Sequence, residues 1–310
     1  MGSCFTENIG ARLRELKFDI VENPHGILFN PASIAAALSD CCLGREYGKD
    51  DIFPFNEGWH SWNHHSRFSD PDPEICLRKI NNSIARAHAF LQRARWVLVT
   101  LGSAFVYGLR EEADNRFPGD RIVANCHKLP AARFSRRLLL ADELDRLLDM
   151  LRVEIGKRNP AAEIIFTVSP VRHLREGFVD NNRSKAALLT AVHRQVEAHD
   201  TVHYFPAYEL VIDDLRDYRF YAEDLVHPNY AATKYVWEKM VQSCLDEPTR
   251  ELIRPLQALR TAFLHRPFNP QSQAHARFLA DNLQQLRRLQ TQYPHIDFGE
   301  EERHFNNEVR

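Results

Sequence analysis

Three apolar runs separated by helical segments restrict the fold more than any other feature of this sequence. The runs are WVLVTLG (96–102), EIIFTVSP (163–170) and TVHYFPAYEL (201–210), with helical patterns over 137–157 and 184–199 between them. Continuous apolar runs of this length are typical of strands buried on both faces of a parallel sheet. Strands that alternate with helices form right-handed βαβ units, which place helices on both faces. The sequence therefore predicts an α/β fold, a three-layer α/β/α sandwich with a mainly parallel sheet.

The rest of the chain adds helices around this pattern. Further helical segments are predicted over 7–17, 32–43, 76–94 and 230–246, and a short strand over 18–22. Residues 182–185 are expected to form a capped, solvated helix start. We expect an α/β domain over 1–246 and a helical extension packed on it over 247–310, because HRPFNPQS (265–272) interrupts a charged helical pattern there. In that extension a hairpin over 247–293 would precede a frayed tail.

The composition excludes several classes of protein. The 310 residues are 44% hydrophobic and 26% charged, with a formal net charge of −2, so no global field attracts nucleic acid. No window approaches the ~18 consecutive apolar residues of a membrane span. The six cysteines form no Cys-x-x-Cys pair, and reduced thiols in a cytoplasmic protein are therefore expected. The sequence indicates no metal, no organic cofactor and no particular oligomeric state.

An Asp-x-x-His pair follows the last predicted strand. Asp224 and His227 lie in FYAEDLVHPN (220–229), beyond the third apolar run. Ligands of open α/β sheets bind beyond the carboxyl ends of the strands, so the position suits a functional site. An Asp three residues before a His can accept a hydrogen bond from the imidazole and leave the other nitrogen free to take a proton from a nucleophile. Chance and helix capping also produce this spacing.

A serine near the start of the chain is the candidate nucleophile. Ser3 lies in Gly2-Ser3-Cys4-Phe5, directly before a predicted helix. Glycine permits a tight turn that exposes a serine hydroxyl, and a helix N-terminus favours a developing negative charge. Taken alone, these four residues are better explained by a serine that caps the helix. Cys4 is a second candidate nucleophile because thiolates attack acyl groups readily, although a Cys in such a turn more often points into the core.

Eight segments together resemble the GSCFA family, which is named for a Gly-Ser-Cys-Phe-Ala motif and is related to the SGNH hydrolases. They are, in order, GSCF, NPHGILFNP, WHSWNHHSRFS, TLGSAFVY, VANCHKLP, SPVRHL, DNNRSKA and RFYAEDLVHPN. The resemblance extends through the helical tail, where HRPFNPQSQAH (265–275) also matches. It implies an SGNH-like sandwich in which Ser3 is the nucleophile, His227 the base and Asp224 the acid of a triad.

The same resemblance implies an oxyanion hole that is incomplete in this chain. Gly26 stands where a backbone N–H would join that of Ser3 in binding the oxyanion. The Gly-x-Asn block of SGNH enzymes is here Gly102-Ser103-Ala104, so the asparagine donor is missing. Loss of one such donor typically lowers the rate on the order of a hundredfold or more. The candidates for its replacement are Ser103, Asn125 and His173.

Residues 51–75 are rich in aromatic and histidine side chains and have no clean periodicity. Long loops of this kind inside compact domains are usually functional or disordered, and the aromatic content argues against disorder. We therefore expect a lid or a substrate-recognition segment over 56–68, with His60 in the substrate-binding set. His60 and His64 also have the i, i+4 spacing of a helical metal-ligand pair, with His65 beside them. A third ligand has no sequence signal, so a metal site is the weaker hypothesis.

The site residues predict hydrolysis or transfer of an acyl ester. Ser3 would attack the carbonyl, His227 would accept and return the proton, and Asp224 would orient His227. SGNH relatives act on acylated carbohydrates and lipids, so the resemblance implies a small-molecule ester or an O-acylated saccharide, on which the aromatic loop would stack. The alternative is a non-catalytic binding or scaffold protein that retained the fold, and the missing asparagine favours it.

The position of Ser3 has a consequence for the sheet. In an SGNH sheet the nucleophile follows the first strand, yet only Met1 and Gly2 precede Ser3. A strand needs about five residues, so we expect the natural chain to begin upstream with an apolar strand. A gap or distorted pairing should then separate the strands near 18–22 and 96–102. The Ser3 hydroxyl should lie within hydrogen-bond reach of His227.

Overall fold

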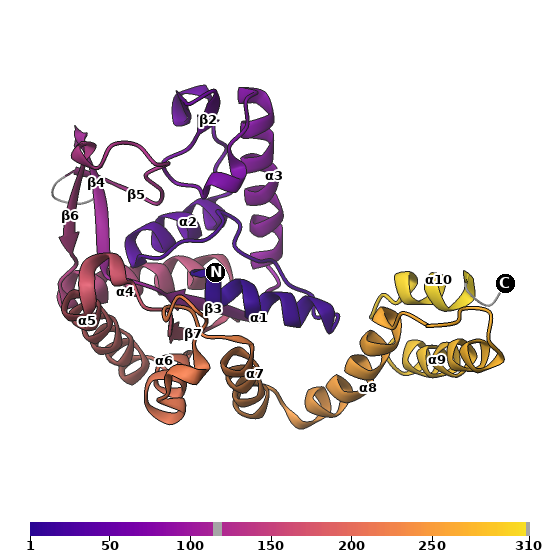
Figure 1. The fold of residues 1–310 in the computed structure, drawn as a ribbon. Helices are drawn as coiled ribbons and strands as arrows, with labels where there is room; N and C mark the ends of the chain where they lie inside the picture. The colour runs from indigo at the N-terminus through magenta and orange to yellow at the C-terminus, as the bar shows by residue number, and fades with distance from the viewer. Residues whose placement is uncertain (114–119, 308–310) are drawn as a thin grey trace. The chain divides into compact units, whose positions relative to one another are not determined.

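The computed structural model describes residues 1–113 and 120–307, and they divide into two compact units. The first unit comprises Met1–Asn8 and Val21–Trp237, and the second comprises Ile9–Ile20 and the chain from Glu238 onward. Two helices, α1 (Cys4–Glu15) and α7 (Tyr230–Cys244), begin in the first unit and end in the second. Figure 1 shows the course of the chain.

A parallel sheet forms the centre of the first unit. Its strands are β3 (Trp96–Leu101), β7 (Glu163–Val168) and β8 (Val202–Tyr204), in the order β3-β7-β8. The three predicted apolar runs are thus strands of one parallel sheet. The third strand is shorter than predicted because Pro206 follows it and has no N–H to donate to a neighbouring strand.

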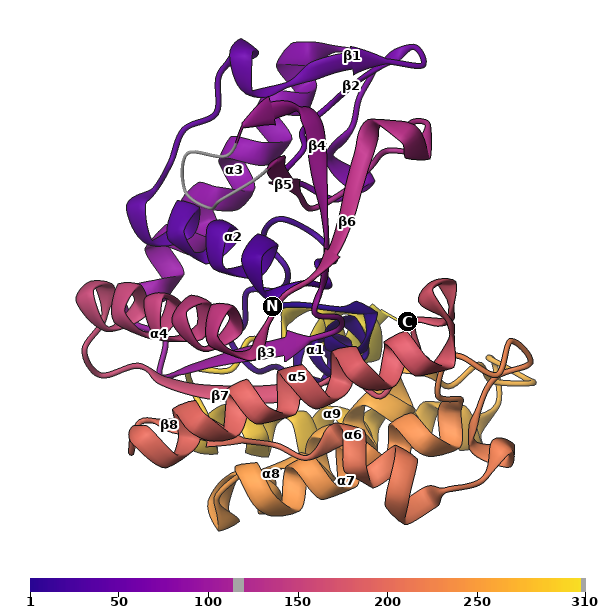
Figure 2. The same cartoon turned by 90° about the vertical axis from the view of Figure 1, so that its left-hand side faces the viewer.

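Helices α2 (Pro31–Leu43), α3 (Pro73–Leu91), α4 (Ala141–Arg158) and α5 (Gly177–Ala198) surround the sheet (Figure 2). Buried side chains of α2, α4 and α5 share one core with the sheet, as Ile34, Leu148 and Leu188 do with Phe166. Asn30 caps α2, because its side chain accepts the N–H of Ser33 at 2.8 Å. The first unit is therefore an α/β structure whose parallel sheet has three strands.

The remaining helices of the first unit are short. After β8 the chain forms α6 (Ala207–Glu209) and a π-helix over Leu210–Leu215. Single 3₁₀ turns lie at Lys49–Asp51, Ser66–Phe68, Ala131–Arg133, Leu174–Glu176 and Tyr218–Phe220.

The structure contains two antiparallel elements that the sequence did not predict. Strands β4 (Phe105–Ala113), β5 (Asp120–Val123) and β6 (Phe134–Leu138) form a sheet in the order β5-β4-β6. A hairpin of β1 (Phe53–Phe55) and β2 (Gly58–His60) lies near it, at the opposite end of the unit from β8 (Figure 2).

The aromatic segment belongs to this antiparallel region. Trp62 is buried, and its ring stacks on that of Phe53 at a centroid distance of 3.8 Å. Leu109, Val123 and Phe134 from the antiparallel strands complete a second small core around it. Trp62 is therefore not open to a ligand, and burial of its apolar area stabilises this region. Phe53, Phe55 and Trp59 are partly exposed, and stacking of a sugar on this segment stays a prediction.

The start of the chain pairs with the free edge of β3. Gly2 forms a parallel bridge with Thr100, and the N–H of Thr100 donates to the Met1 carbonyl at 2.9 Å. Residues 18–22, all of which are described, form no strand, so the predicted strand at that position is wrong. Asp19 and Asn23 interrupt its apolar pattern, and only Val21 packs against the core of the sheet.

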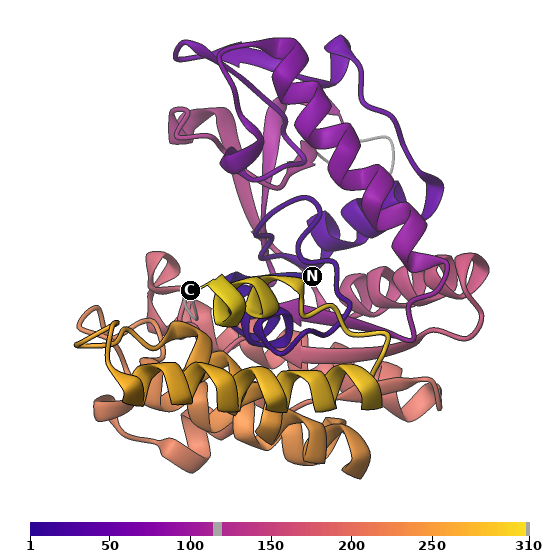
Figure 3. The same ribbon diagram turned by 90° about the vertical axis from the view of Figure 1, so that its right-hand side faces the viewer.

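The second unit is helical. It contains α8 (Glu247–Leu264), α9 (Gln273–Gln292) and α10 (Gly299–Asn307), and Figure 3 shows α10 beside α9. The predicted hairpin is present, but the prediction of a frayed tail is wrong for residues 299–307. Phe298 and Phe305 are buried, and Glu301 pairs with Lys17 at 2.8 Å. These anchors hold the last helix on its unit.

Replacement of Phe305 by alanine should lower the free energy of unfolding of this helical unit by about 3–5 kcal/mol, because the buried ring leaves a cavity. Phe268 is fully exposed, so Phe268→Ala is the matched control and should change stability by less than about 0.5 kcal/mol. Urea unfolding followed by far-UV circular dichroism measures both. Equal effects of the two substitutions would show that α10 does not contribute to the core.

Candidate functional site

The segments that carry Ser3, His173 and His227 lie at the carboxyl edge of the parallel sheet, whereas His60 and Asn125 belong to the antiparallel region. Ser3 comes directly after the bridge between Gly2 and Thr100, and so lies at the end of β3. Beyond the end of β7, the N–H of Arg172 donates to the Val226 carbonyl at 3.3 Å. This bond joins the loop after β7 to the loop that carries His227. Parallel strands direct their carboxyl ends to one edge, where open α/β sheets bind ligands.

Asp224 and His227 form a closely hydrogen-bonded pair. Nδ1 of His227 lies 2.6 Å from Oδ2 of Asp224. The other carboxylate oxygen accepts the backbone N–H groups of Val226 at 2.9 Å and His227 at 3.0 Å. The short loop therefore fixes the carboxylate first, and the carboxylate then fixes the tautomer of the imidazole with Nε2 free of the proton.

These contacts also stabilise the charge of Asp224. The N–H of His227, its imidazole and the N–H of Val226 together lower the pKa of the Asp224 carboxyl to about 2. The carboxylate therefore stays ionised across the neutral and mildly acidic range, as a group that orients an imidazole must. Both side chains are about half exposed, so the pair is open to solvent.

Ser3 has a different environment. It is 1% exposed, and its hydroxyl has no hydrogen-bond partner among the described residues. The predicted hydrogen bond to His227 is therefore not formed in this structure. The physical reason is that Ser3 is buried where α1 begins beside β3, whereas His227 stands on an exposed loop. A buried hydroxyl without a partner is costly, and such groups often belong to functional sites.

The proposed oxyanion donors are largely occupied. The N–H of Gly26 donates to the Asn23 carbonyl at 2.7 Å in a tight turn, so it is not available to an oxyanion. The Ser103 hydroxyl lies 3.3 Å from the Ser184 hydroxyl and accepts the N–H of Phe105. Asn125 accepts the N–H of His127 with its side-chain oxygen. The N–H of Gly26 is thus engaged in this structure, and its role as an oxyanion donor stays a prediction.

His173 is the best placed of the predicted polar groups. Its Nε2 lies against Gly102 at the end of β3, where an added Cβ would meet it at 3.2 Å. Burial, followed by the nearby charges of Lys185 and His227, lowers the pKa of His173 to about 4. Nε2 has no hydrogen-bond partner among the described residues. A neutral imidazole with a free nitrogen therefore stands at this edge of the sheet.

Sequence reasoning missed two residues that organise this edge. Lys185 was expected on a solvated helix start, but α5 begins at Gly177 and Lys185 is buried. Its ammonium donates to the carbonyls of Gly102 and Ser169, each at 2.7 Å. The Ser184 hydroxyl accepts the N–H of Ala104 at 2.7 Å. Their spacing with Leu188, at i+4 and i+3, was the signal for a buried helix face.

The histidine and cysteine alternatives receive little support. Both ring nitrogens of His60 lie within hydrogen-bond distance of Ser69 and the Phe55 carbonyl, at 2.7 and 2.8 Å. His60 ends a strand and His64 lies in the loop after it. The prediction that they form an i, i+4 ligand pair on a helix is therefore wrong. Residues 1–113 and 120–307 contain no cluster suited to a metal ion. The Cys4 side chain lies outside the described part of the structure.

The fold and this edge define an α/β protein with a paired Asp and His beyond a parallel sheet. The model of the GSCFA family matches residues 1–240, and that of the GSCFA domain protein, C-terminal domain, matches residues 256–310. The chain therefore belongs to the GSCFA family. No curated protein and no solved structure matches it. Among the described residues, no helix has the length and hydropathy needed to cross a membrane.

The lowered pKa of His173 predicts a loss of stability in mild acid. The unfolded chain binds a proton near pH 6.5, whereas the folded state binds it only near pH 4, so stability falls as pH decreases through this window. His173→Gln should make this dependence shallower in urea titrations at pH 4–7. His295→Gln, at an exposed position, should leave it unchanged. An NMR titration of His173 near pH 6.5 would contradict the assignment.

Proposed function

We propose that this protein is a serine esterase or transacylase of SGNH type that acts on an O-acylated substrate, such as an acylated saccharide. The observation that carries the proposal is the 2.6 Å contact between His227 Nδ1 and Asp224 Oδ2 at the edge of the sheet where Ser3 also lies. An imidazole held by a carboxylate is the usual activator of a serine. The finer fold assignment, a three-layer SGNH sandwich, belongs to the same proposal.

In the proposed reaction, the Ser3 hydroxyl attacks the acyl carbonyl while His227 Nε2 takes its proton. His227 then returns the proton to the leaving alcohol, and an acyl-serine remains. Water or a second alcohol attacks this ester with the same proton transfers, which frees Ser3. Asp224 stays ionised throughout and stabilises the imidazolium, in agreement with its lowered pKa.

The burial of Ser3 sets a condition on this mechanism. A substrate carbonyl must reach a side chain that is 1% exposed, so binding must displace the start of α1 or the loops around it. Catalytic hydrogen bonds are often long in free enzymes and shorten only when substrate binds. The donor to the oxyanion would then be Nε2 of His173 rather than the N–H of Gly26, either in the neutral tautomer that carries its proton on Nε2 or through a bridging water.

The second candidate function is that of a binding or scaffold protein. The burial of Ser3 and the occupied N–H of Gly26 favour it. It differs from the esterase proposal in one respect that can be measured, because a scaffold would not form a covalent serine adduct.

A serine-directed fluorophosphonate should label Ser3, and the protein should cleave 4-nitrophenyl acetate. Ser3→Ala and His227→Ala should each lower kcat/KM by at least about 10³-fold, and the double variant should lose little more, because the two residues act as a unit. Intact-protein and peptide mass spectrometry locate the adduct.

Ser243→Ala and His295→Ala are the matched controls, since both positions are exposed and lie in the second unit. Full activity in Ser3→Ala with labelling at Cys4 would transfer the nucleophile role to Cys4. A folded protein that is neither labelled nor active would favour the scaffold function.

A further inference from the structure

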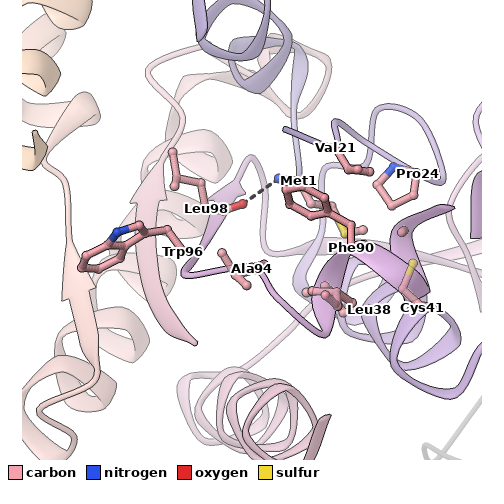
Figure 4. Close-up of a pocket in the computed structure, with 12 residues that line it drawn as sticks. Met1, Val21, Pro24, Leu38, Cys41, Phe90, Ala94, Trp96 and Leu98 are labelled. Carbon is pink, nitrogen blue, oxygen red and sulfur yellow. Dashed lines mark hydrogen bonds between the residues drawn. The ribbon is translucent and has the colours of Figure 1, made fainter. Parts of the chain in front are cut away.

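The pocket beside the first half of β3 is apolar (Figure 4). Its lining side chains include Phe90 and Trp96, and the Met1 amine donates there to the Leu98 carbonyl at 2.6 Å. The candidate site lies beyond the other end of this strand. The pocket and the site are thus at opposite ends of β3, and the contacts that bear on the site are those of the loop over 220–229.

The loop that carries Asp224 and His227 is closed at its base by its own backbone. Tyr221 and Pro228 form an antiparallel bridge. The N–H of Ala222 donates to the His227 carbonyl at 2.8 Å. These contacts fix the two ends of the loop, whereas its tip, with Asp224 and His227, is exposed.

The backbone at this tip needs support from outside the loop. Leu225 has a φ of 56°, in the left-handed region that residues with a branched side chain rarely adopt. Such a conformation persists only where the surroundings hold it. The carbonyls of Leu225 and Val226 are the last two before His227, so the groups that bind them determine where the imidazole lies.

Arg172 binds both of these carbonyls. Its Nη1 donates to the Leu225 carbonyl at 3.2 Å, and its backbone N–H donates to the Val226 carbonyl at 3.3 Å. Its guanidinium also lies over the ring of Tyr221, with Cζ 4.2 Å from the ring centroid. A planar guanidinium can donate hydrogen bonds while it stacks on an aromatic ring. One side chain therefore holds the tip of the loop and its base together.

The segment around Arg172 is itself anchored beyond β7. The Ser169 hydroxyl accepts the N–H of Val171 at 3.3 Å, and Val171 is buried. The side chain of Asn181, on α5, accepts the N–H of His173 at 2.9 Å. Arg172 stands between these two anchored residues, so it connects a fixed part of the sheet edge to an exposed loop.

We propose that Arg172 is the positioning residue of the Asp224–His227 pair. It acts through the carbonyls of Leu225 and Val226, and it holds the imidazole at the carboxyl edge of the sheet without taking part in proton transfer. Its effect on catalysis rests on the proposed esterase function, whereas its effect on the loop can be measured whatever the reaction is.

Arg172→Met tests the role, because methionine keeps an apolar stem and removes the donors and the charge. The tip of the loop should then loosen, and the Asp224 carboxylate should lose N–H groups that lower its pKa. An NMR titration should show this pKa rising from about 2 toward its ordinary value of 3.8. Arg175→Met is the matched control and should leave the pKa unchanged, since the Arg175 guanidinium lies over the ring of Tyr107 in the antiparallel sheet.

The rate should respond in the same direction. In Arg172→Met, kcat for 4-nitrophenyl acetate should fall about a hundredfold, because a misplaced base reacts slowly. KM should stay within about twofold, because the interaction lost does not bind the ester. Arg172→Lys restores the charge but not the planar fork, so it should recover only part of kcat. Arg172→Gln, which is shorter and uncharged, should reproduce both effects even if the methionine side chain disturbs folding.

An Asp224 pKa that stays at about 2 in the folded Arg172→Met or Arg172→Gln protein would overturn the proposal. A starting protein without esterase activity would contradict the proposed function instead. In that case a raised Asp224 pKa in the Arg172 variants would still support the positioning role.

Discussion

A buried ammonium holds the carboxyl edge of the parallel sheet together. Lys185 donates to the carbonyls of Gly102 and Ser169, which end neighbouring strands. These carbonyls lie where the ladder stops, and a buried carbonyl without a donor is costly. A lysine buried in this way requires partners of good geometry. The site lies next to this contact, because His173 Nε2 is close to Gly102 and the N–H of Arg172, three residues after Ser169, donates to the Val226 carbonyl in the loop of His227.

The sequence predicted those parts of the fold whose signal is local and strong. WVLVTLG and EIIFTV are mostly apolar and show no polar alternation, as strands buried on both faces do, and they form β3 and β7. The antiparallel sheet over 105–138 was missed. Its strands mix Arg, Glu and Tyr with apolar residues, so they lack a continuous apolar run. The sequence also does not show which of these strands pair with one another. Register between distant strands is a tertiary property.

The candidate site divides in the same way. Asp224 and His227 are three residues apart, so one loop can bring them together, and the contact is largely a local matter. The distance between Ser3 and His227 depends on how two segments far apart in the chain pack together, so it cannot be predicted from the sequence spacing. Lys185 was misplaced because lysine is almost always solvated, and its helix periodicity was the better guide. The catalytic roles of Ser3, Asp224 and His227 stay predictions.

Gly2 connects β3 with the candidate site. Its φ of 142° lies in a region that residues with a Cβ rarely adopt, and an added Cβ would meet the Thr100 carbonyl oxygen at 2.2 Å. The N–H of Gly2 donates to the Asn23 side chain, and its carbonyl accepts the N–H of Leu28. Gly2 is thus held from both sides, by β3 and by the 23–28 segment. Because Ser3 is the next residue, the direction of its hydroxyl follows from the pairing of Met1 and Gly2 with β3.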